Sequence, residues 1–336
     1  MLRDKNHKSI LMRPLEKAFG LPSPYNLVEG LGCMQREQHG PDRKHGVRVP
    51  YLPHDSVINE GVTPEFRLGF VGDILDTKGM PAEIAPDIRA FFSDCDALLG
   101  NFESIITDLP GHGTSVRHIP AMMDTLAALF PPENTYLSIA NNHAGDYPTA
   151  VLFNSIRQLE QRGFNVFGWD EKPYIDITST LRVIGATDWS NAACEHVAML
   201  EKRTTPTYRK AQAFNLLYPH WGYELELYPR RSMLRKAARW NRYGFDAILA
   251  HHGHTPRAIF SIPQLDTGLK SLVADSLGDF VCGFEPVWYN YGIIGKLTLG
   301  RDAQGRFAAG SLAWRFCRTR PENGTVRTEL CDEPEY

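Results

Sequence analysis

The sequence predicts an α/β fold in which mixed β-sheets are flanked by helices. From residue 66 onward, short apolar stretches typical of buried strands alternate with stretches of helical spacing, which favours a substantial sheet. The C-terminal end is rich in strand-like segments, and this suggests a mixed sheet or a two-sheet sandwich. A chain of 336 residues fits one large α/β domain with appendages.

The first 64 residues differ from the rest. They are rich in proline, glycine, histidine and charge, and they show no sustained helical or strand period. We therefore expect residues 1–64 to be an irregular N-terminal extension and residues 65–336 to form the main domain. The extension could be a lid over a site or an arm that binds a partner.

The expected elements of the main domain follow one another along the chain. Short apolar runs that stop at polar or glycine residues predict strands at 66–74, 96–104, 135–143, 165–169, 181–187, 214–222, 246–254 and 271–280. Helical spacing predicts helices over 80–92, 121–130, 148–163 and 229–244. Pro148 suits a first helical turn, and Gly163 suits a helix end. Residues 293–300 and 307–316 predict a terminal β-hairpin.

Composition and charge argue against several classes of protein. Apolar residues make up 43% and charged residues 22%, and the net charge of -3 does not favour binding to nucleic acid. No apolar run approaches the roughly 20 residues of a membrane helix, and no signal-peptide core is found, so we expect a cytoplasmic protein. The six scattered cysteines favour buried thiols over a disulfide framework or a cysteine-type zinc site. The oligomeric state is left open.

Polar side chains gather where the expected strands stop. They are Asp73; Asn101 and Glu103; Asn141, Asn142, His143 and Asp146; His220 and Glu224; His251, His252 and His254; and Asp275 and Asp279. Open α/β sheets bind ligands at the carboxyl ends of their strands, so strands that point the same way would bring these clusters together. Carboxylates, an amide oxygen and imidazoles suit Mn, Fe or Zn better than Ca or Mg alone. With about six ligands, two metals roughly 4 Å apart are more natural than one.

Each cluster alone also has a structural explanation. Asp73 could cap the next helix, and Glu103 could be a surface carboxylate. A lone histidine at a strand end is more often structural than a ligand. His252 and His254 are stronger candidates, because alternation along a strand points both imidazoles to one face. His251 would then point the other way, and we interpret it as structural.

These motifs resemble those of the poly-γ-glutamate capsule synthesis (CapA) proteins, within the calcineurin-like metallophosphatase fold group. The resemblance covers roughly residues 66–280 and lies in GD at 72–73, NFES at 101–104, ANNHAGDY at 140–147, HWGYE at 220–224, AHHGH at 250–254 and SLGDF at 276–280. It implies a layered metallophosphatase-like fold and a metal site built from Asp73, Glu103, Asn142, His220, His252 and His254. It also implies that His143 is a general acid or a contact to an anionic group, with Asp146 holding its ring.

The sequence departs from the family patterns at three places. Ile74 and Leu75 follow Asp73 where the wider metallophosphatases have Asp-x-His, an absence shared with the CapA proteins. Ala250 replaces a usual glycine, and Asp279 replaces the asparagine of SLGNF. The extra carboxylate could strengthen metal binding or repel an anionic substrate. We also expect no N-terminal membrane anchor or export signal of the kind that many capsule proteins carry.

The helix expected over 229–244 is strongly basic. It places four arginines near one face: Arg231, Arg235, Arg239 and Arg242. An anion-binding rim is one interpretation. A solvated basic face, with Leu234, Ala237 and Ala238 packed inward, is the favoured one.

The leading hypothesis is a metal-dependent, phosphoesterase-like hydrolase, in which metal-activated water attacks a phosphoester or a related ester or amide. One alternative is a capsule protein that acts on γ-glutamyl amides, and another is a metal-binding module without turnover. The expected partner is a small anionic or glutamyl-type substrate, with candidate contacts at Asn141, Glu224 and Arg117. The expected cofactor is one or two divalent ions of Mn, Fe or Zn.

Overall fold

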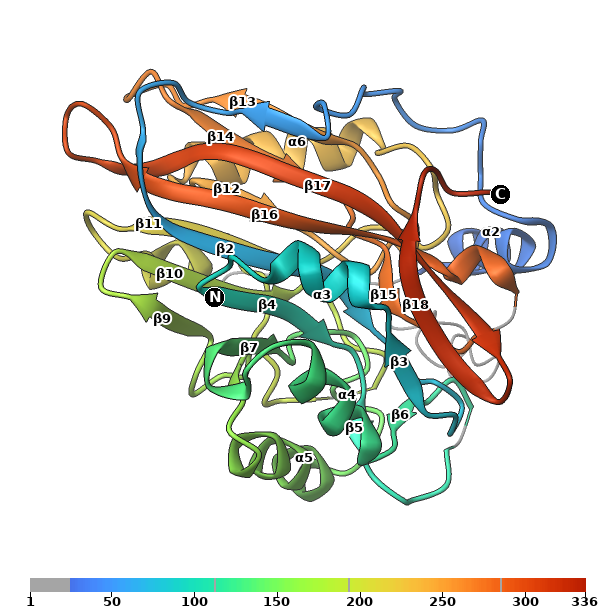
Figure 1. Ribbon diagram of the computed structural model, residues 1–336. Coiled ribbons are helices and arrows are strands. Elements are labelled where there is room, and N and C mark those ends of the chain that lie inside the picture. Colours follow the sequence, from blue (N-terminus) through green and yellow to red (C-terminus); the bar gives the residue numbers. More distant parts are fainter. Residues whose placement is uncertain (1–24, 112, 193, 285) are drawn as a thin grey trace, which may run out of the picture.

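Two β-sheets packed face to face form the centre of the molecule (Figure 1). The computed structural model describes residues 25–111, 113–192, 194–284 and 286–336. The larger sheet has the order β3 (Ala82–Ile84), β18 (Thr325–Cys331), β17 (Phe307–Glu322), β16 (Tyr291–Arg301), β2 (Thr63–Ile74), β4 (Ala97–Phe102), β7 (Thr135–Ser138) and β8 (Asn165–Phe167). Two short strands join it: β1 (Asp55–Val57) pairs with β17, and β15 (Asp279–Val281) pairs with β2.

The second sheet is also mixed. Its order is β13 (Ile259–Pro263), β14 (Lys270–Ala274), β12 (Ala247–Leu249), β11 (Phe214–His220), β10 (Leu181–Thr187) and β9 (Tyr174–Thr178). A separate pair consists of β5 (Ile105–Ile106) and β6 (Arg117–His118). Apolar residues from both large sheets interlock between them, including Phe70 and Leu99 from one and Leu216 and Leu249 from the other. Burial of this shared core holds the two sheets together.

Helices cover the outer faces of the sheets. The larger sheet carries α3 (Pro86–Phe92), α4 (Ala121–Leu129) and α5 (Thr149–Gln161), which pack through residues such as Phe92, Leu126 and Ile156. The second sheet carries α6 (Arg231–Arg242), which packs through Met233 and Trp240. The layers therefore run helix, sheet, sheet, helix, and the predicted α/β fold with mixed sheets flanked by helices is confirmed.

Strand direction determines where the site lies. In the larger sheet β2, β4, β7 and β8 run parallel to one another, and in the second sheet β10, β11, β12 and β14 do the same. Parallel neighbours bring their carboxyl ends to one edge of a sheet.

Two expected elements divide in the structure. Residues 80–92, expected as one helix, form β3 and then α3, because Pro86 is preorganised for a first helical turn and lacks the N–H needed inside a helix. Residues 271–280, expected as one strand, form β14 and β15, which belong to different sheets. Gly278 makes the bend between them with a φ of 64°, and a Cβ there would lie 2.4 Å from the Tyr291 carbonyl oxygen.

The strand expected over residues 246–254 ends early. β12 stops at Leu249, and His252 and His254 have φ values of 83° and 49°. These values lie outside the extended region, so the alternation of side chains along a strand does not apply to this segment.

The N-terminal extension is more regular than expected. Residues 1–24 lie outside the described part of the chain, but α2 (Leu27–His39) follows them, with the Glu29 N–H donating to Asn26 Oδ1 at 2.9 Å. Arg36 Nε donates a hydrogen bond to the Glu224 carbonyl oxygen at 2.7 Å. No local sequence pattern predicts this contact. The division at residue 64 stays a prediction, and β2 already begins at Thr63. In the described ranges, no helix has the length and apolar character needed to cross a membrane.

Candidate metal centre

The six predicted metal ligands meet where strands of both sheets end. They are Asp73 near the end of β2, Glu103 directly after β4, Asn142 after β7, His220 at the end of β11, and His252 and His254 after β12. All six side chains are buried. The site therefore forms across the edge at which the two sheets face each other.

The Glu103 carboxylate lies at the centre of this cluster. Its Oε1 is 3.3 Å from His220 Nε2 and 3.8 Å from His254 Nε2. Burial alone would raise the pKa of Glu103, but the neighbouring imidazoles of His220 and His254 outweigh it and lower the pKa to about 2. Glu103 is thus an anion placed between imidazole nitrogens.

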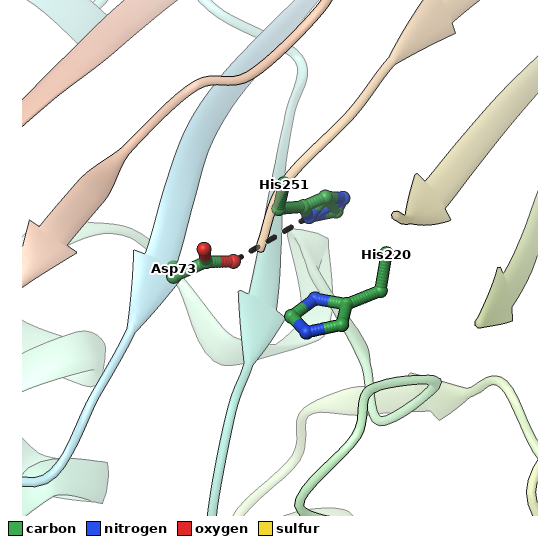
Figure 2. A group of neighbouring side chains, drawn as sticks. All are labelled: Asp73, His220 and His251. Atoms are coloured by element: carbon green, nitrogen blue, oxygen red, sulfur yellow. Dashed lines mark ion pairs between the residues drawn. The ribbon is translucent and has the colours of Figure 1, made fainter. Parts of the chain in front are cut away.

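Asp73 is held through both of its carboxylate oxygens. Asn101 Nδ2 donates to Oδ1 at 2.7 Å, and the backbone N–H of His252 donates to Oδ2 at 3.0 Å. His251 Nδ1 lies 3.6 Å from Oδ1, and Figure 2 shows the side chains of Asp73, His220 and His251 converging. The prediction that His251 points away is wrong: His251 still pairs with His220 as a parallel bridge, and the positive φ values of His252 and His254 end the alternation on which the prediction depended.

His220 joins the two halves of the cluster. Its Nε2 lies 2.7 Å from Asn142 Oδ1, close to the Glu103 carboxylate as well. Two sets of three donor atoms, each within 4.8 Å of one another, include His220: Asp73 with His220 and His251, and Glu103 with His220 and His252. A further set of the same kind joins Asp73 and Glu103 with His254.

Several buried polar atoms of the cluster have no hydrogen-bond partner within the described residues. They are Glu103 Oε1 and both ring nitrogens of His251 and of His252. Each unpaired buried polar atom costs about 1–3 kcal/mol. A divalent ion would take up Glu103 Oε1 and one ring nitrogen of a histidine, and nitrogen and oxygen donors of this kind fit Mn, Fe or Zn. The residues therefore fit divalent metal binding, and this chemistry alone does not select one metal.

His143 stands at the mouth of the cluster. Its Nδ1–H donates to Asp146 Oδ2 at 2.7 Å, and its Nε2 lies 3.9 Å from Glu103 Oε1. Burial lowers the pKa of His143, but the Asp146 carboxylate outweighs that effect and raises it above the ordinary value. The ring lines a cavity of about 840 Å³ that also touches Asn142, Glu224 and His254.

Two carboxylates that the sequence predicted near the site lie beside the predicted ligands. Glu224, predicted to contact substrate, lines the cavity and places Oε1 3.6 Å from His252 Nε2. Asp279 is fully buried, and its Oδ1 accepts a hydrogen bond from His254 Nδ1 at 2.8 Å. Asp279 thus holds the Nδ1 side of the His254 ring and leaves Nε2 directed at Glu103. Of the two roles considered for this extra carboxylate, the position favours support of the metal ligand over repulsion of an anionic substrate.

Three of the singled-out residues lie elsewhere. Asn141 is buried, donates to the Phe102 carbonyl oxygen and accepts the His143 N–H, so it supports the His143 turn and does not line the cavity. Arg117 donates to the Leu109 carbonyl oxygen and is also absent from the cavity wall. The predicted substrate contacts of both residues therefore lack support. Asp275 pairs with the buried Arg257 at 3.3 Å and does not join the cluster.

Sequence reasoning missed Asn191 and Glu37. Asn191 lies in a bend after β10, and its Nδ2 is 3.4 Å from His143 Nδ1. Asn191 and Glu37 of α2 both line the cavity. Neither residue carries a local signal, because both reach the site through contacts between distant segments.

The arginines of α6 lie on a solvated side of the molecule, as favoured. Arg231, Arg235 and Arg242 are exposed, while Met233, Ala237 and Trp240 are buried. Of the three residues expected inward, Ala237 is buried, whereas Leu234 and Ala238 are only partly buried.

Fold and site together define a layered α/β protein with a buried carboxylate–histidine cluster that fits divalent metals. Residues 67–174 match the family model described as bacterial capsule synthesis protein PGA_cap. The chain is 22% identical over 261 residues to the PGA biosynthesis protein CapA of Bacillus subtilis (strain 168), with 70% of this chain covered. Over the matched residues the chain is similar to these capsule-synthesis proteins. The match spans 65% of the relative's length, slightly under two thirds.

Solved structures give weaker likenesses. TT1561 of Thermus thermophilus aligns with a TM-score of 0.36 at 10% identity, covering 69% of this chain and 94% of that one. The purple acid phosphatase PPD1 of yellow lupin (Lupinus luteus) aligns with a TM-score of 0.36 at 12% identity, covering 78% and 54%. Vps29 of Chaetomium thermophilum aligns with a TM-score of 0.30 at 10% identity, covering 76% and 100%. These scores are too low to argue function from the likeness.

Proposed function

We propose that the protein is a metal-dependent hydrolase of the CapA-like type, acting on a phosphoester or a related ester or amide. The observation that carries this proposal is the unpaired Glu103 Oε1, buried between the imidazoles of His220 and His254 beside a cavity. A buried anion beside imidazole nitrogens, with the rings of His251 and His252 lacking hydrogen-bond partners within the described residues, is the arrangement expected of a metal site.

The chain's own residues divide into two groups of ligands that share Glu103. Asp73, Glu103 and His254 would hold one ion. Glu103, His220 and His252 would hold the other, with the Asn142 oxygen beside His220. His251 adds an imidazole on the Asp73 side, where Leu75 stands in place of the Asp-x-His histidine. When bound, such ions supply a water of lowered pKa and stabilise developing negative charge.

His143 is placed to move a proton at the cavity wall. Because its Nδ1–H donates to Asp146, the imidazole is oriented with Nε2 toward the cluster. A proton held on Nε2 can pass to the oxygen or nitrogen of a leaving group. Before that transfer, the His143 Nε2–H would bind an anionic group of the substrate.

A second candidate is chemistry on γ-linked glutamyl amides. The observation in its favour is the match to a protein named for PGA biosynthesis. The same His143 and metal ligands would serve an amide, since the leaving nitrogen also needs a proton. A metal-binding module without turnover is the remaining alternative.

The test is a panel of phosphomonoesters, phosphodiesters and γ-glutamyl peptides, assayed with protein loaded separately with Mn, Fe and Zn. We expect metal-dependent turnover of one substrate class, with strong loss in a His252→Ala/His254→Ala variant. Turnover of the glutamyl peptides alone would select the second candidate. Metal bound without turnover on any compound would contradict the hydrolase and favour the non-catalytic module.

A further inference from the structure

We infer a separate anion-binding site in a pocket between α6 and the loops that follow β10 and β11. The pocket has a volume of about 370 Å³. Its ligand class is an oxyanion group, either a phosphate or a carboxylate, because guanidinium groups stand in its wall. The inference goes beyond the proposed hydrolase, since the site requires neither a metal nor turnover.

The charges in the pocket wall are unbalanced. The charged residues that line it are Asp188, Arg235, Lys236 and Arg239. Lys236 and Asp188 form an ion pair, and this pair uses the one carboxylate of the wall. Arg235 and Arg239 have no hydrogen bond and no ion pair within the described residues. Two guanidinium groups, one helical turn apart, therefore face the pocket without a counter-charge from its lining.

The composition of α6 makes this positive charge unfavourable in the absence of an anion. The helix has twelve residues, of which none is acidic and five are basic: Arg231, Arg235, Lys236, Arg239 and Arg242. Like charges that lie four residues apart on a helix repel each other, as Arg235 and Arg239 do. The chain as a whole carries a net charge of -3, so the positive charge is a local feature. An oxyanion held between the two guanidinium groups would relieve the repulsion.

A buried hydrogen-bond donor in the same wall independently points to a ligand. Trp189 lines the pocket and is only 4% exposed, and its Nε1 has no hydrogen-bond partner within the described residues. Buried indole N–H groups ordinarily have a partner, because an unpaired donor loses its hydration without compensation. An acceptor oxygen of an anion bound in this pocket would supply the missing partner.

Aromatic rings separate this pocket from the metal centre. The Trp189 ring lies 5.7 Å from the Tyr25 ring, which in turn stacks on Tyr223 at 5.7 Å between centroids. Trp189 also contacts the His252 ring edge to face, at 4.6 Å between centroids. No residue lines both this pocket and the cavity that His143 lines. The anion site is therefore a neighbour of the metal centre and not a part of it.

Isothermal titration calorimetry with a charge-matched control tests the inference. Full-length protein is titrated with inorganic phosphate and, separately, with glutarate as a carboxylate probe. Arg235→Gln/Arg239→Gln should weaken binding of at least one probe by about tenfold or more, because charge-assisted hydrogen bonds are lost. Arg231→Gln/Arg242→Gln removes the same charge from exposed positions of α6 outside the pocket, and should weaken binding by less than about threefold.

Equal weakening in the two double variants, or no binding of either probe at millimolar concentration, would overturn the inference. The probe whose binding weakens in the pocket variant alone identifies the ligand as a phosphate or a carboxylate. Each titration is repeated after chelator treatment, which removes phosphate binding by a metal and leaves binding in the pocket, and near-ultraviolet circular dichroism checks folding. Pocket binding by a protein that turns over no compound would keep this site and contradict the hydrolase. Turnover without pocket binding would keep the hydrolase alone.

Discussion

His143 and Asp146 show how one hydrogen bond fixes the chemistry available to a ring. Asp146 Oδ2 accepts from His143 Nδ1 at 2.7 Å and from the Val116 N–H at 3.0 Å. The carboxylate therefore orients the imidazole and also holds the neighbouring loop. Only Nε2 remains for a substrate.

Replacing His143 by alanine should lower kcat by about 10²–10⁴-fold, because a positioned general acid contributes that much. Metal content should survive, since His143 is in none of the triplets of ligand atoms. Steady-state kinetics and elemental analysis measure the two effects. His196→Ala, a partly exposed histidine paired with Asp170, is the matched control. Unchanged turnover in His143→Ala would remove this residue from the mechanism.

Asp279 should strengthen the metal site through His254. Asp279→Asn keeps the shape of the side chain but removes the charge that supports the ring, so metal affinity should fall by about 10–100-fold. Competition with a chromophoric chelator measures this affinity, and the exposed Asp266→Asn serves as control. Equal or tighter binding in Asp279→Asn would mean that the carboxylate does not support the metal ligand.

At the scale of elements, the segment after β12 depends on a buried ion pair. Arg257 is fully buried, with Nε 3.3 Å from Asp275 Oδ2. A Cβ on Gly253 would lie 2.2 Å from Arg257 Nη2, so the pair packs directly against the turn between His252 and His254. The pair positions the turn without contacting a ligand itself.

Replacing one partner of this ion pair should lower the free energy of unfolding strongly. Replacing both partners with apolar residues should lower it much less. Arg257→Met leaves Asp275 buried and unpaired, and the free energy of unfolding should fall by about 3–5 kcal/mol. The double variant Arg257→Met/Asp275→Leu should recover most of that loss. Urea unfolding measures both. A double variant that loses the sum of the two single effects would show that the residues are not coupled.

The elements also show what a sequence can reveal. Polar residues at the ends of apolar runs predicted the convergence of Asp73, Glu103 and His220, because parallel strands end at one edge. The orientation of His251 was not predictable, since it depends on positive φ values in the residues that follow. The contact of Arg36 with Glu224 was not predictable either, because it joins positions 188 residues apart.

At the scale of the whole molecule, the candidate centre belongs to both sheets. Asp73 and Glu103 come from the larger sheet, His220 and His252 come from the second, and the His252 N–H donates across to Asp73. An ion bound here would join the two halves of the fold. Its removal should therefore lower thermal stability as well as turnover, because ligands that bind only the native state stabilise it.

The most direct test is elemental analysis of protein purified without a metal-affinity tag, beside the His252→Ala/His254→Ala variant. The structure predicts about one to two equivalents of Mn, Fe or Zn per chain, largely lost in the variant, because Glu103 and its imidazole neighbours form the ligand set. Absence of metal under every loading condition would contradict the metal centre and the hydrolase that depends on it.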